Sequence, residues 1–463
     1  MRSTDAAFLA EACGGRISGE EGIIVKNVKI DSRACGPGDL FVCIVGEKND
    51  GHNYISKAYG QGCRAFLVSE DVEEAPGAVY IHVEDTNLAV RQMAQAYLAQ
   101  FSVIKIGVTG SVGKTTTRML TAAVMSAKYR TVCTQKNLNT HLGLCLTCFL
   151  ADESTQCVVF EMGMDRKNEI AEYVEWVRPQ LAIITNVGIS HMERLGSRDA
   201  IADAKLEIVN KFTEDNTLIV NSFSDYLKTE AEIRERAVNK SGYKIVRVGE
   251  DICFENLKNK GNDGIEFYVN GVKFGLPLLG EHNALDACLA IACGKEFGIT
   301  EEQASAALAT VQPAERRLKA ENINGVLLMD DSYNASPDSM KAGIAALEGV
   351  GATRRIAVLS DMLELGSAED SGHVEVGKFA AEHGVDILIA TGKKKEYYFR
   401  GVLQSGISRT STIGPEDLDS VKDLVIQIVR PGDAVLVKGS NSTQIGQVAE
   451  HIRNTYGKVL QDK

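Results

Sequence analysis

The sequence predicts an α/β protein of three domains: a small N-terminal α/β domain, a central P-loop domain with a mainly parallel sheet, and a C-terminal Rossmann-like domain. Apolar runs of strand length alternate with helical patterns along most of residues 102–463, as in parallel sheets covered by helices. A glycine-rich turn joins one strand to the next helix at residues 107–117. The 463 residues also exceed one typical core. We therefore predict domains at residues 1–101, 102–313 and 314–463.

The N-terminal domain is predicted from short apolar runs separated by polar turns. These runs lie at residues 22–30, 40–45, 65–68 and 79–83. They indicate a small mixed sheet. Residues 87–101 then show the period of an amphipathic helix, which Asp85 or Thr86 would cap.

The central domain is predicted from strand signals with helical patterns between most of them. The strands are expected at residues 103–108, 157–161, 181–185, 217–221 and 244–248. Residues 267–274 are typical of a hairpin, because Asn270-Gly271 is a favoured two-residue turn. An alanine-rich helix is expected at residues 280–298, closing the domain.

The C-terminal domain is predicted to begin after Gln312-Pro313 and to repeat the alternation of strand and helix. Strands are expected at residues 326–330, 356–359, 387–390 and 434–437, and helices include 336–347, 373–383 and 418–429. This pattern indicates a second doubly wound sheet. It contains no G-x-G-x-x-G, so dinucleotide binding is unsupported.

Residues 107–117 read Gly-Val-Thr-Gly-Ser-Val-Gly-Lys-Thr-Thr-Thr, after a strand and before a helical pattern that starts near Arg118. Such a turn presents backbone N–H groups to a polyphosphate. Lys114 would neutralise the outer phosphates, and the Thr115 hydroxyl would bind Mg²⁺. The strict motif needs glycine where this chain has Val108, so an ordinary strand-to-helix turn is the alternative. The loop predicts a site for a nucleoside triphosphate.

Composition narrows the class of protein. The chain is 44% apolar and 24% charged, which is typical of a soluble globular protein. Its net charge of −12 argues against non-specific nucleic-acid binding. The first residues lack the pattern of a signal peptide, and no apolar run approaches the roughly 20 residues of a membrane span. We expect a cytoplasmic protein with no nucleic-acid partner and no membrane insertion.

The eleven cysteines show no paired framework and suit a reducing cytosol. Cys145 and Cys148 form a C-x-x-C inside the apolar run 142–150, which has helical character. Two buried small side chains explain this spacing better than a metal or redox pair.

Two candidate ligands follow neighbouring predicted strands. Glu161 ends one strand, and His191 closes the segment Asn186-Val-Gly-Ile-Ser-His after the next. Ligands of open parallel sheets lie at the carboxyl ends of strands, so Glu161 is placed to hold Mg²⁺ and His191 to bind a ligand. The alternatives are a helix cap or surface charge for Glu161 and a structural role for His191.

Further candidates lie near the second domain boundary. An Asn283 amide can pair with a base edge and His282 can stack on a ring, although Asn283 could instead cap the following helix. Arg316 and Arg317 could reach across a cleft to a phosphate. In the run 330–339, Ser336 and Pro337 are explained as a helix start, whereas Asp330-Asp331 are not.

Taken in order, these segments resemble the Mur ligases, the ATP-dependent amino-acid ligases of peptidoglycan synthesis. The most particular signals are Asp-Ser-Tyr-Asn-Ala-Ser-Pro-Asp-Ser-Met at 331–340 and Leu-Ser-Asp-Met-Leu-Glu-Leu-Gly at 359–366. Asp50-Gly-His52 and Val437-Lys-Gly-Ser440 agree, and the resemblance covers nearly the whole chain. It is strongest to the branch that adds D-alanyl-D-alanine. The Asn-Pro-Arg signature usual in the branch that adds the third amino acid is absent.

The resemblance implies a reaction and its participants. ATP would phosphorylate the terminal carboxylate of UDP-MurNAc-tripeptide, and the amine of D-alanyl-D-alanine would attack the acyl phosphate. This would be the last cytoplasmic step in building the pentapeptide nucleotide. The first domain would bind UDP, the second ATP, and the third the dipeptide and part of the ATP. We expect ATP and two Mg²⁺ ions as cofactors, and a monomer.

The resemblance also implies residue roles. The catalytic residues would be Lys114, His191, Lys205 and Arg317. Nucleotide contacts would come from Gly110, Ser111, Val112, Gly113, Lys114, Thr115, Thr116, His282, Asn283, Arg317 and Asp331. The metal ligands would be Thr115, Glu161, His191 and Lys205, with Lys205 carried as a carbamate. Substrate contacts would come from Ser32, Arg33, Asp50, Gly51, His52, Asn139, Thr140, Asn334 and Ser336.

The chain departs from the family pattern at four positions. Thr140 and Asp286 stand where asparagine is common, Ser360 replaces a usual glycine, and Asn441 replaces a usual arginine. The sequence leaves two alternative functions open. One is a ligase of different specificity, either a sibling or a folylpolyglutamate-type synthetase. The other is a P-loop switch, motor or kinase with flanking binding modules.

Overall fold

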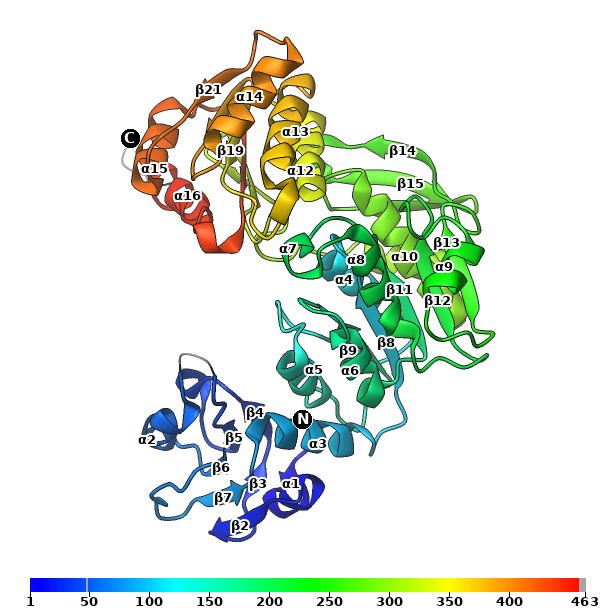
Figure 1. Ribbon diagram of the computed structural model, residues 1–463, viewed down its shortest axis with the longest axis vertical. Helices are drawn as coiled ribbons and strands as arrows, with labels where there is room; N and C mark the ends of the chain where they lie inside the picture. Colours follow the sequence, from blue (N-terminus) through cyan, green and yellow to red (C-terminus); the bar gives the residue numbers. More distant parts are fainter. Residues whose placement is uncertain (47–48, 458–463) are drawn as a thin grey trace. The chain divides into compact units, whose positions relative to one another are not determined.

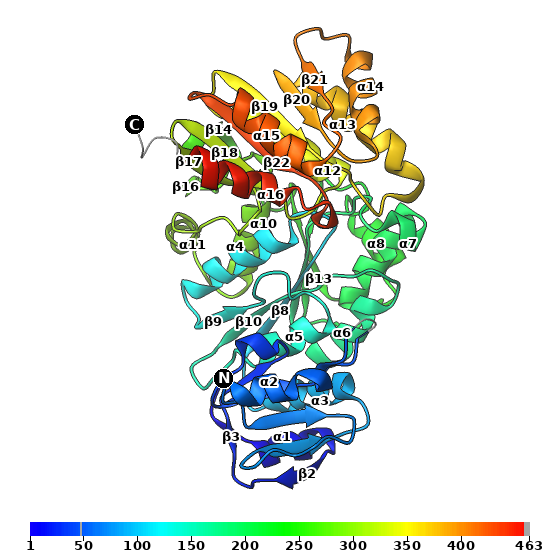
Figure 2. The ribbon, with the colours of Figure 1, turned by 90° about the vertical axis from the view of Figure 1, so that its left-hand side faces the viewer.

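The computed structural model describes residues 1–46 and 49–457 and divides the chain into two compact units. Unit 1 comprises residues 1–108, 128–163 and 172–181, and unit 2 comprises residues 109–127, 164–171 and 182–463. Figures 1 and 2 show the course of the chain. The domain bounds predicted from the sequence remain a prediction.

The N-terminal part of unit 1 is a small mixed sheet with helices, as predicted. Its five-stranded sheet has the order β2-β7-β6-β5-β4, in which only the β2–β7 pair is antiparallel. The elements are β1 (Thr4–Asp5), α1 (Ala6–Cys13), β2 (Arg16–Gly19), β3 (Ile24–Val25), β4 (Asn27–Lys29), β5 (Asp39–Val42), α2 (Ile55–Gly60), β6 (Ala65–Val68), β7 (Val79–His82) and α3 (Thr86–Leu98). Asp85 caps α3 by accepting from Asn87 N and Leu88 N.

The central region contains the predicted parallel sheet, with strand order β13-β12-β11-β8-β10-β9. Its strands are β8 (Ile104–Thr109), β9 (Thr131–Cys133), β10 (Cys157–Glu161), β11 (Leu181–Ile184), β12 (Thr217–Asn221) and β13 (Lys244–Val248). The helices are α4 (Lys114–Ser126), α5 (His141–Cys148), α6 (Glu169–Val177), α7 (Met192–Leu195), α8 (Arg198–Leu206), α9 (Glu230–Arg236), α10 (His282–Glu296) and α11 (Glu301–Leu308). In unit 2, α4 packs beside α10 (Figure 2).

Helix α4 corrects one expectation. The sequence pattern placed its start near Arg118, but it begins at Lys114, directly after Gly113. Gly113 has a φ of 84°, and this left-handed turn lets the chain enter the helix without a side-chain cap. The polar run Lys-Thr-Thr-Thr therefore forms the first helical turn, where amide groups face outward along the helix axis.

A three-stranded antiparallel sheet holds the predicted hairpin. It consists of β14 (Glu255–Asn259), β15 (Ile265–Val269) and β16 (Val272–Leu276). Val269 pairs with Val272, so Asn270 and Gly271 form the two-residue turn, with φ of 49° and 79°. Positive φ at both positions is the geometry that favours Asn-Gly.

Replacing Gly271 by alanine is expected to destabilise unit 2 by about 1 kcal/mol, because alanine is strained at positive φ. Urea unfolding measures this loss. Gly275→Ala is the matched control, since Gly275 lies in β16, has no positive φ, and a Cβ added there meets nothing within 4 Å. Equal losses in the two variants would contradict the turn geometry.

The C-terminal sheet has the order β17-β18-β22-β19-β20-β21, with β17 antiparallel to β18 and the remaining pairs parallel. Its strands are β17 (Lys319–Ile323), β18 (Val326–Asp331), β19 (Arg354–Leu359), β20 (Ile387–Ala390), β21 (Ser411–Ile413) and β22 (Asp433–Lys438). The helices are α12 (Pro337–Gly349), α13 (Glu369–Glu382), α14 (Lys395–Ser405), α15 (Leu418–Ile428) and α16 (Gly446–His451).

Two apolar cores cover the two faces of this sheet. One joins α12, α13 and α14 to residues such as Met329 and Leu436, and the other joins α15 and α16 to residues such as Leu328 and Val435. Figure 1 shows α15 and α16 on one side of β19 and α12 and α13 on the other. Neighbouring strand residues thus point to opposite cores, which confirms the doubly wound arrangement.

The cysteines behave as the sequence predicts. Cys145 and Cys148 are both buried on α5, and all eleven cysteines are free. Burial raises the pKa of Cys145 to about 12, so its thiol is unreactive at neutral pH. Within residues 1–46 and 49–457, no helix is long and apolar enough to cross a bilayer.

Candidate active site

The phosphate loop between β8 and α4 is a tight backbone turn. Gly110 has a φ of 153°, and a Cβ placed there would lie 1.8 Å from Thr185 Oγ1. Thr185 directly follows β11. A side chain at residue 110 would clash with it, so only glycine fits this position. The same threonine donates to the Val112 carbonyl, which fixes the middle of the loop.

The segment that follows β11 holds the loop in place. Asn186 Oδ1 accepts from Ser111 N at 3.2 Å and from Val112 N at 2.9 Å. In return, Ser111 Oγ accepts from Gly188 N at 2.8 Å. These bonds rigidify the turn, so that the first amides of α4 are presented in a fixed orientation.

Cationic groups of unit 2 gather at this helix terminus. Lys114 Nζ lies 2.7 Å from the Gly110 carbonyl oxygen and 3.2 Å from that of Ser111, so its ammonium group arches over the loop. Arg317 Nη2 lies 3.5 Å from Thr115 Oγ1, and its guanidinium stacks 3.9 Å above the Tyr333 ring. Lys114, Thr115 and Arg317 are thus brought together as the sequence predicts.

A pocket opens beside the loop, between α4, α10 and the C-terminal sheet. Its lining includes Val112, Gly113, Thr115, Thr116, His282, Asn283, Asp286, Arg317, Asp331 and Lys438. Most of the predicted nucleotide contacts therefore face one cavity. A pocket next to a helix N-terminus, at the carboxyl end of a parallel sheet, is a common place for a nucleotide.

Asn283 does not cap α10. Glu281 is the residue before the helix, and Asn283 lies one position inside it. Its Nδ2 donates to the Leu279 carbonyl at 2.6 Å. The capping alternative is therefore wrong, because this amide ties the preceding loop to the helix rather than closing the helix end.

The two aspartates at the end of β18 have different partners. Asp330 accepts from Ser332 Oγ and pairs with Arg453 Nη2 at 2.9 Å, so it stabilises the C-terminal fold. Asp331 lies on the pocket and pairs with Lys438 Nζ at 2.6 Å. The paired aspartates thus comprise one structural residue and one pocket residue.

The predicted substrate residues that follow Asp331 are part of the same turn. Asn334 offers its backbone carbonyl to Lys438 Nζ at 3.1 Å. Ser336 precedes α12 and donates its backbone N–H to Ser339 Oγ at 2.9 Å, with Pro337 at the first helical position. The helix start predicted from the sequence is confirmed, while substrate contact stays a prediction.

His191 lies between two carboxylates. Its Nδ1 is 3.1 Å from Asp165 Oδ1 and 3.1 Å from Glu364 Oε2. The nearby His191 ring lowers the pKa of the Glu364 carboxyl. The residue has a φ of 65°, so its backbone is strained at the point where the ring turns toward these groups.

Lys205 is buried on α8, with 1% of its surface exposed. Across the described part of the chain, no hydrogen bond to its Nζ is found. Burial lowers its pKa well below the usual value, and the charge of Lys114 lowers it further. The amine is therefore neutral far below the pH at which an exposed lysine loses its proton.

Glu161 and two predicted substrate residues belong to unit 1. Glu161 is fully buried, and its Oε1 accepts from Asn139 Nδ2 at 2.9 Å. Thr140 follows Asn139 and precedes α5, but its side chain makes no capping bond. Unit 1 thus brings together Glu161 and Asn139, a predicted metal ligand and a predicted substrate contact.

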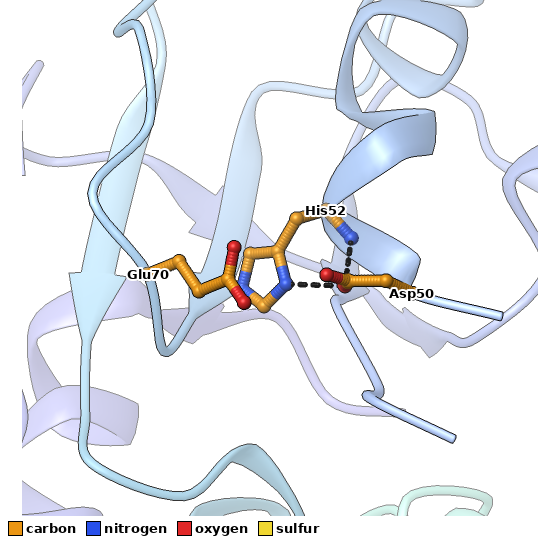
Figure 3. A group of neighbouring side chains, drawn as sticks. All are labelled: Asp50, His52 and Glu70. Carbon is orange, nitrogen blue, oxygen red and sulfur yellow. Dashed lines mark hydrogen bonds and ion pairs between the residues drawn. The ribbon is translucent and has the colours of Figure 1, made fainter. Parts of the chain in front are cut away.

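The remaining predicted substrate residues lie in the N-terminal sheet region of unit 1. Figure 3 shows His52 between Asp50 and Glu70. His52 Nδ1 is 2.6 Å from Asp50 Oδ1, and its Nε2 accepts from Ser69 N at 3.0 Å. Both ring nitrogens are engaged, so His52 braces this loop rather than serving as a metal ligand.

Neighbouring positions in this region have local structural roles as well. A Cβ on Gly51 would lie 2.6 Å from Ile44 N, so the chain requires glycine there. Arg33 pairs with Asp31 at 2.8 Å, and its hydrogen bonds lower the pKa of Asp31 to about 2. Ser32 is buried in the short 3₁₀ turn Ser32–Ala34.

Comparison with known proteins assigns the family. The Mur ligase family catalytic domain matches residues 24–98, the Mur ligase middle domain 108–294, and the Mur ligase glutamate ligase domain 316–441. The UDP-N-acetylmuramoyl-tripeptide–D-alanyl-D-alanine ligase of Bacillus subtilis is 34% identical over 439 residues, which cover 93% of this chain and 94% of that protein. The chain belongs to the Mur ligase family.

Solved structures of Mur ligases agree with this fold. The crystal structure of MurF from Acinetobacter baumannii superimposes with a TM-score of 0.86 and 26% identity, covering 98% of this chain and all of that one. MurF ligase from Thermotoga maritima in complex with ADP gives a TM-score of 0.77 at 24% identity, covering 93% and 98%. The likeness extends over 93% or more of each chain compared.

Sequence reasoning on this Mur ligase missed three residues near the candidate site. Asp165 follows β10 by four positions, and Glu364 lies inside the segment 359–366, quoted above without assigning it a role. Their approach to His191 depends on two loops far apart in sequence. Lys438, the partner of Asp331, was likewise noted only as part of a motif.

Proposed function

We propose that this Mur ligase joins D-alanyl-D-alanine to UDP-MurNAc-tripeptide at the expense of ATP, through an acyl phosphate. The observation that carries the proposal is the full-length similarity to ligases of that name, together with Lys114, Thr115 and Arg317 at one helix terminus. A carboxylate is a poor acyl donor, and phosphorylation gives it a good leaving group. The protein's task is then alignment and neutralisation of charge.

We assign ATP to the pocket beside α4. The amides of the first turn of α4 would receive the phosphates, and Lys114 would leave its loop carbonyls to neutralise the outer phosphate oxygens. Arg317 would contact the γ-phosphate, since stacking on Tyr333 holds its guanidinium at the pocket edge. His282, Asn283 and Asp331 would contact the adenosine part.

We assign two Mg²⁺ ions to the ligands Thr115, Glu161, His191 and Lys205. The hydroxyl and carboxylate oxygens suit a hard divalent cation, and a carbamate on Lys205 would add a further oxygen ligand. His191 would add one imidazole nitrogen, a less common donor to Mg²⁺. A buried lysine without a hydrogen-bond partner is suited to carbamylation, since only its neutral amine reacts with CO₂. When bound, the ions would neutralise phosphate charge and orient the reacting oxygens.

The remaining residues would hold the two other substrates. We assign the UDP end of the nucleotide to Ser32, Arg33, Asp50, Gly51 and His52, with Asn139 and Thr140 on the sugar side. We assign the C-terminal substrate contacts to Asn334 and Ser336. We further propose that the enzyme acts as a monomer in the cytoplasm, which suits its eleven free cysteines.

A phosphate-release assay tests this proposal. Release that requires both UDP-MurNAc-tripeptide and D-alanyl-D-alanine supports it, and mass spectrometry should then find the pentapeptide nucleotide. Equal release without either substrate would support a switch or motor instead. Release with another amino acid would identify a ligase of different specificity. Running the assay with the diaminopimelate and lysine tripeptides also identifies the third peptide residue.

Replacing Lys114 by alanine is expected to lower phosphate release by about 10²-fold, because one preorganised charge on the transferring phosphoryl group is lost. Lys128→Ala is the matched control, since Lys128 lies two residues beyond the far end of α4 and is exposed. Similar rates for the wild type and Lys114→Ala would remove Lys114 from the proposed mechanism.

A further inference from the structure

The contacts of His191 are confined to one ring nitrogen. Asp165 and Glu364 both approach Nδ1, at 3.1 Å each, and among the described residues Nε2 has no polar partner. The His191 side chain is 19% exposed, whereas the side chains of Asp165 and Glu364 are 52% and 45% exposed. A neutral imidazole has one N–H, and a carboxylate can only accept it. Neither contact is aligned as a hydrogen bond, but a lone pair on Nδ1 would be repelled by two carboxylate oxygens at 3.1 Å, so these surroundings favour hydrogen on Nδ1 and a lone pair on Nε2.

Glu364 comes from a loop that is firmly anchored within the C-terminal sheet region. Asp361 accepts from Lys393 N and Lys394 N, each at 2.9 Å. Met362 N donates to His373 Nε2 at 3.0 Å, and Leu363 N donates to Ser440 Oγ at 3.0 Å. Each of the three residues before Glu364 is thus fixed by a bond to another element, which holds the backbone from which the Glu364 side chain extends toward His191.

The backbone on both sides of the contact is strained. His191 and Glu364 have φ values of 65° and 64°, in the left-handed region that favours glycine. Glu193 N donates to the Glu364 carbonyl at 3.2 Å, so α7 and this loop also meet through their backbones. Strain of this kind costs about 1–3 kcal/mol per residue and persists where surrounding contacts impose it.

We propose that Glu364, assisted by Asp165, is the positioning residue that orients His191 so that Nε2 is presented to a divalent cation. Metal-binding histidines usually donate their other N–H to a carboxylate, which fixes the ring and raises its basicity. The inference rests on the proposed function, because it takes His191 as a metal ligand. It adds that Glu364, which lies after residue 314, orients the metal ligand His191, which lies before that residue.

Mn²⁺ binding to the full chain in the presence of ADP tests this role. Electron paramagnetic resonance measures affinity, and electron spin-echo modulation detects a directly bound imidazole nitrogen. Wild type should show the nitrogen signal. Glu364→Gln should bind this ion about 10- to 100-fold more weakly and lose most of the signal. Glu193→Gln is the matched control, because Glu193 is an exposed glutamate two residues from His191, and it should behave as wild type.

The outcomes separate the two proposals. Nitrogen modulation that is equal in wild type and Glu364→Gln, with unchanged Mn²⁺ affinity, would overturn the role of Glu364 while leaving the ligase function intact. Absence of nitrogen modulation in wild type would remove His191 as a metal ligand and overturn both assignments. Thermal unfolding of each variant verifies folding. Glu364→Asp, which keeps the carboxylate, should retain more affinity than Glu364→Gln, and the reverse order would count against positioning.

Discussion

Alanine in place of Lys205 should reduce ligation by about 10³-fold, and short carboxylates such as acetate or formate should restore part of the rate. The reason is the environment of the amine. Its burial and the nearby charge of Lys114 favour the uncharged form, and no hydrogen bond to it is found among the described residues. A charged ammonium group at this position would lose its hydration without a compensating partner, which is strongly unfavourable. Addition of CO₂ forms an N–C bond, releases one proton and leaves an anionic oxygen pair.

Lys205→Arg is the decisive control for this mechanism. Arginine keeps a long cationic side chain but forms no carbamate, so it should be inactive and should gain nothing from added carboxylates. Labelling with ¹³C-bicarbonate should give a carbamate carbon resonance in wild type that both variants lack. Full activity of Lys205→Ala without rescue would exclude the carbamate. Binding of ADP by each variant verifies that the pocket still forms.

Lys205 also illustrates why part of the site could not be derived from local sequence. The segment Ala-Asp-Ala-Lys-Leu-Glu-Ile reads as an ordinary helix, in which a lysine is normally exposed. Its burial depends on packing that the helical period does not encode. The resemblance to a family pointed to Lys205, whereas composition and spacing did not. Glu364 and Asp165 are a similar case, because their meeting with His191 requires loops that only the tertiary fold brings together.

The fold was more predictable where patterns are long. The buried strands β10 and β12 have the predicted bounds, because continuous apolar runs with turn signals mark central parallel strands well. The sequence reading missed β9 and β21, which have three residues each and lie at sheet edges. Three residues are too few to show the alternation of apolar and polar side chains by which a strand is recognised. It also missed β17, whose polar residues only become a strand by pairing with β18.

Asparagine in place of Asp286 is expected to make the folded chain more stable than wild type by up to about 4 kcal/mol at neutral pH. Asp286 is buried on α10, and Thr117 Oγ1 donates to its Oδ1 at 3.0 Å. Burial raises its pKa to about 7, and the bond from Thr117 offsets only part of this. The charged side chains that share its pocket or lie on the facing helix α4 are Lys114, Arg118, His282, Arg317, Asp331 and Lys438.

The direction of the pH dependence follows from the number of protons bound by the folded and unfolded states. In the unfolded chain the pKa of this carboxyl is about 3.9, so between pH 4 and 7 the folded state holds a proton that the unfolded state has lost. Wild-type stability contributed by this group is therefore fully present below pH 4 and is lost as pH rises toward 7. Three pH units at about 1.4 kcal/mol each give about 4 kcal/mol. Asparagine does not titrate, so its advantage should grow over this range and then level off.

Urea unfolding of wild type and Asp286→Asn from pH 4.5 to 8 measures the difference directly. Asp215→Asn is the matched control, since Asp215 is an exposed aspartate and the same change of side chain there involves no burial. Curves for Asp286→Asn and wild type that run parallel across the range would show that Asp286 does not titrate there. A protonated aspartic acid has nearly the shape and hydrogen-bonding capacity of asparagine. This similarity accounts for an aspartate at a position where the Mur ligase pattern commonly has asparagine. Below pH 6, where Asp286 is protonated, Asp286→Asn should therefore bind ADP with unchanged affinity.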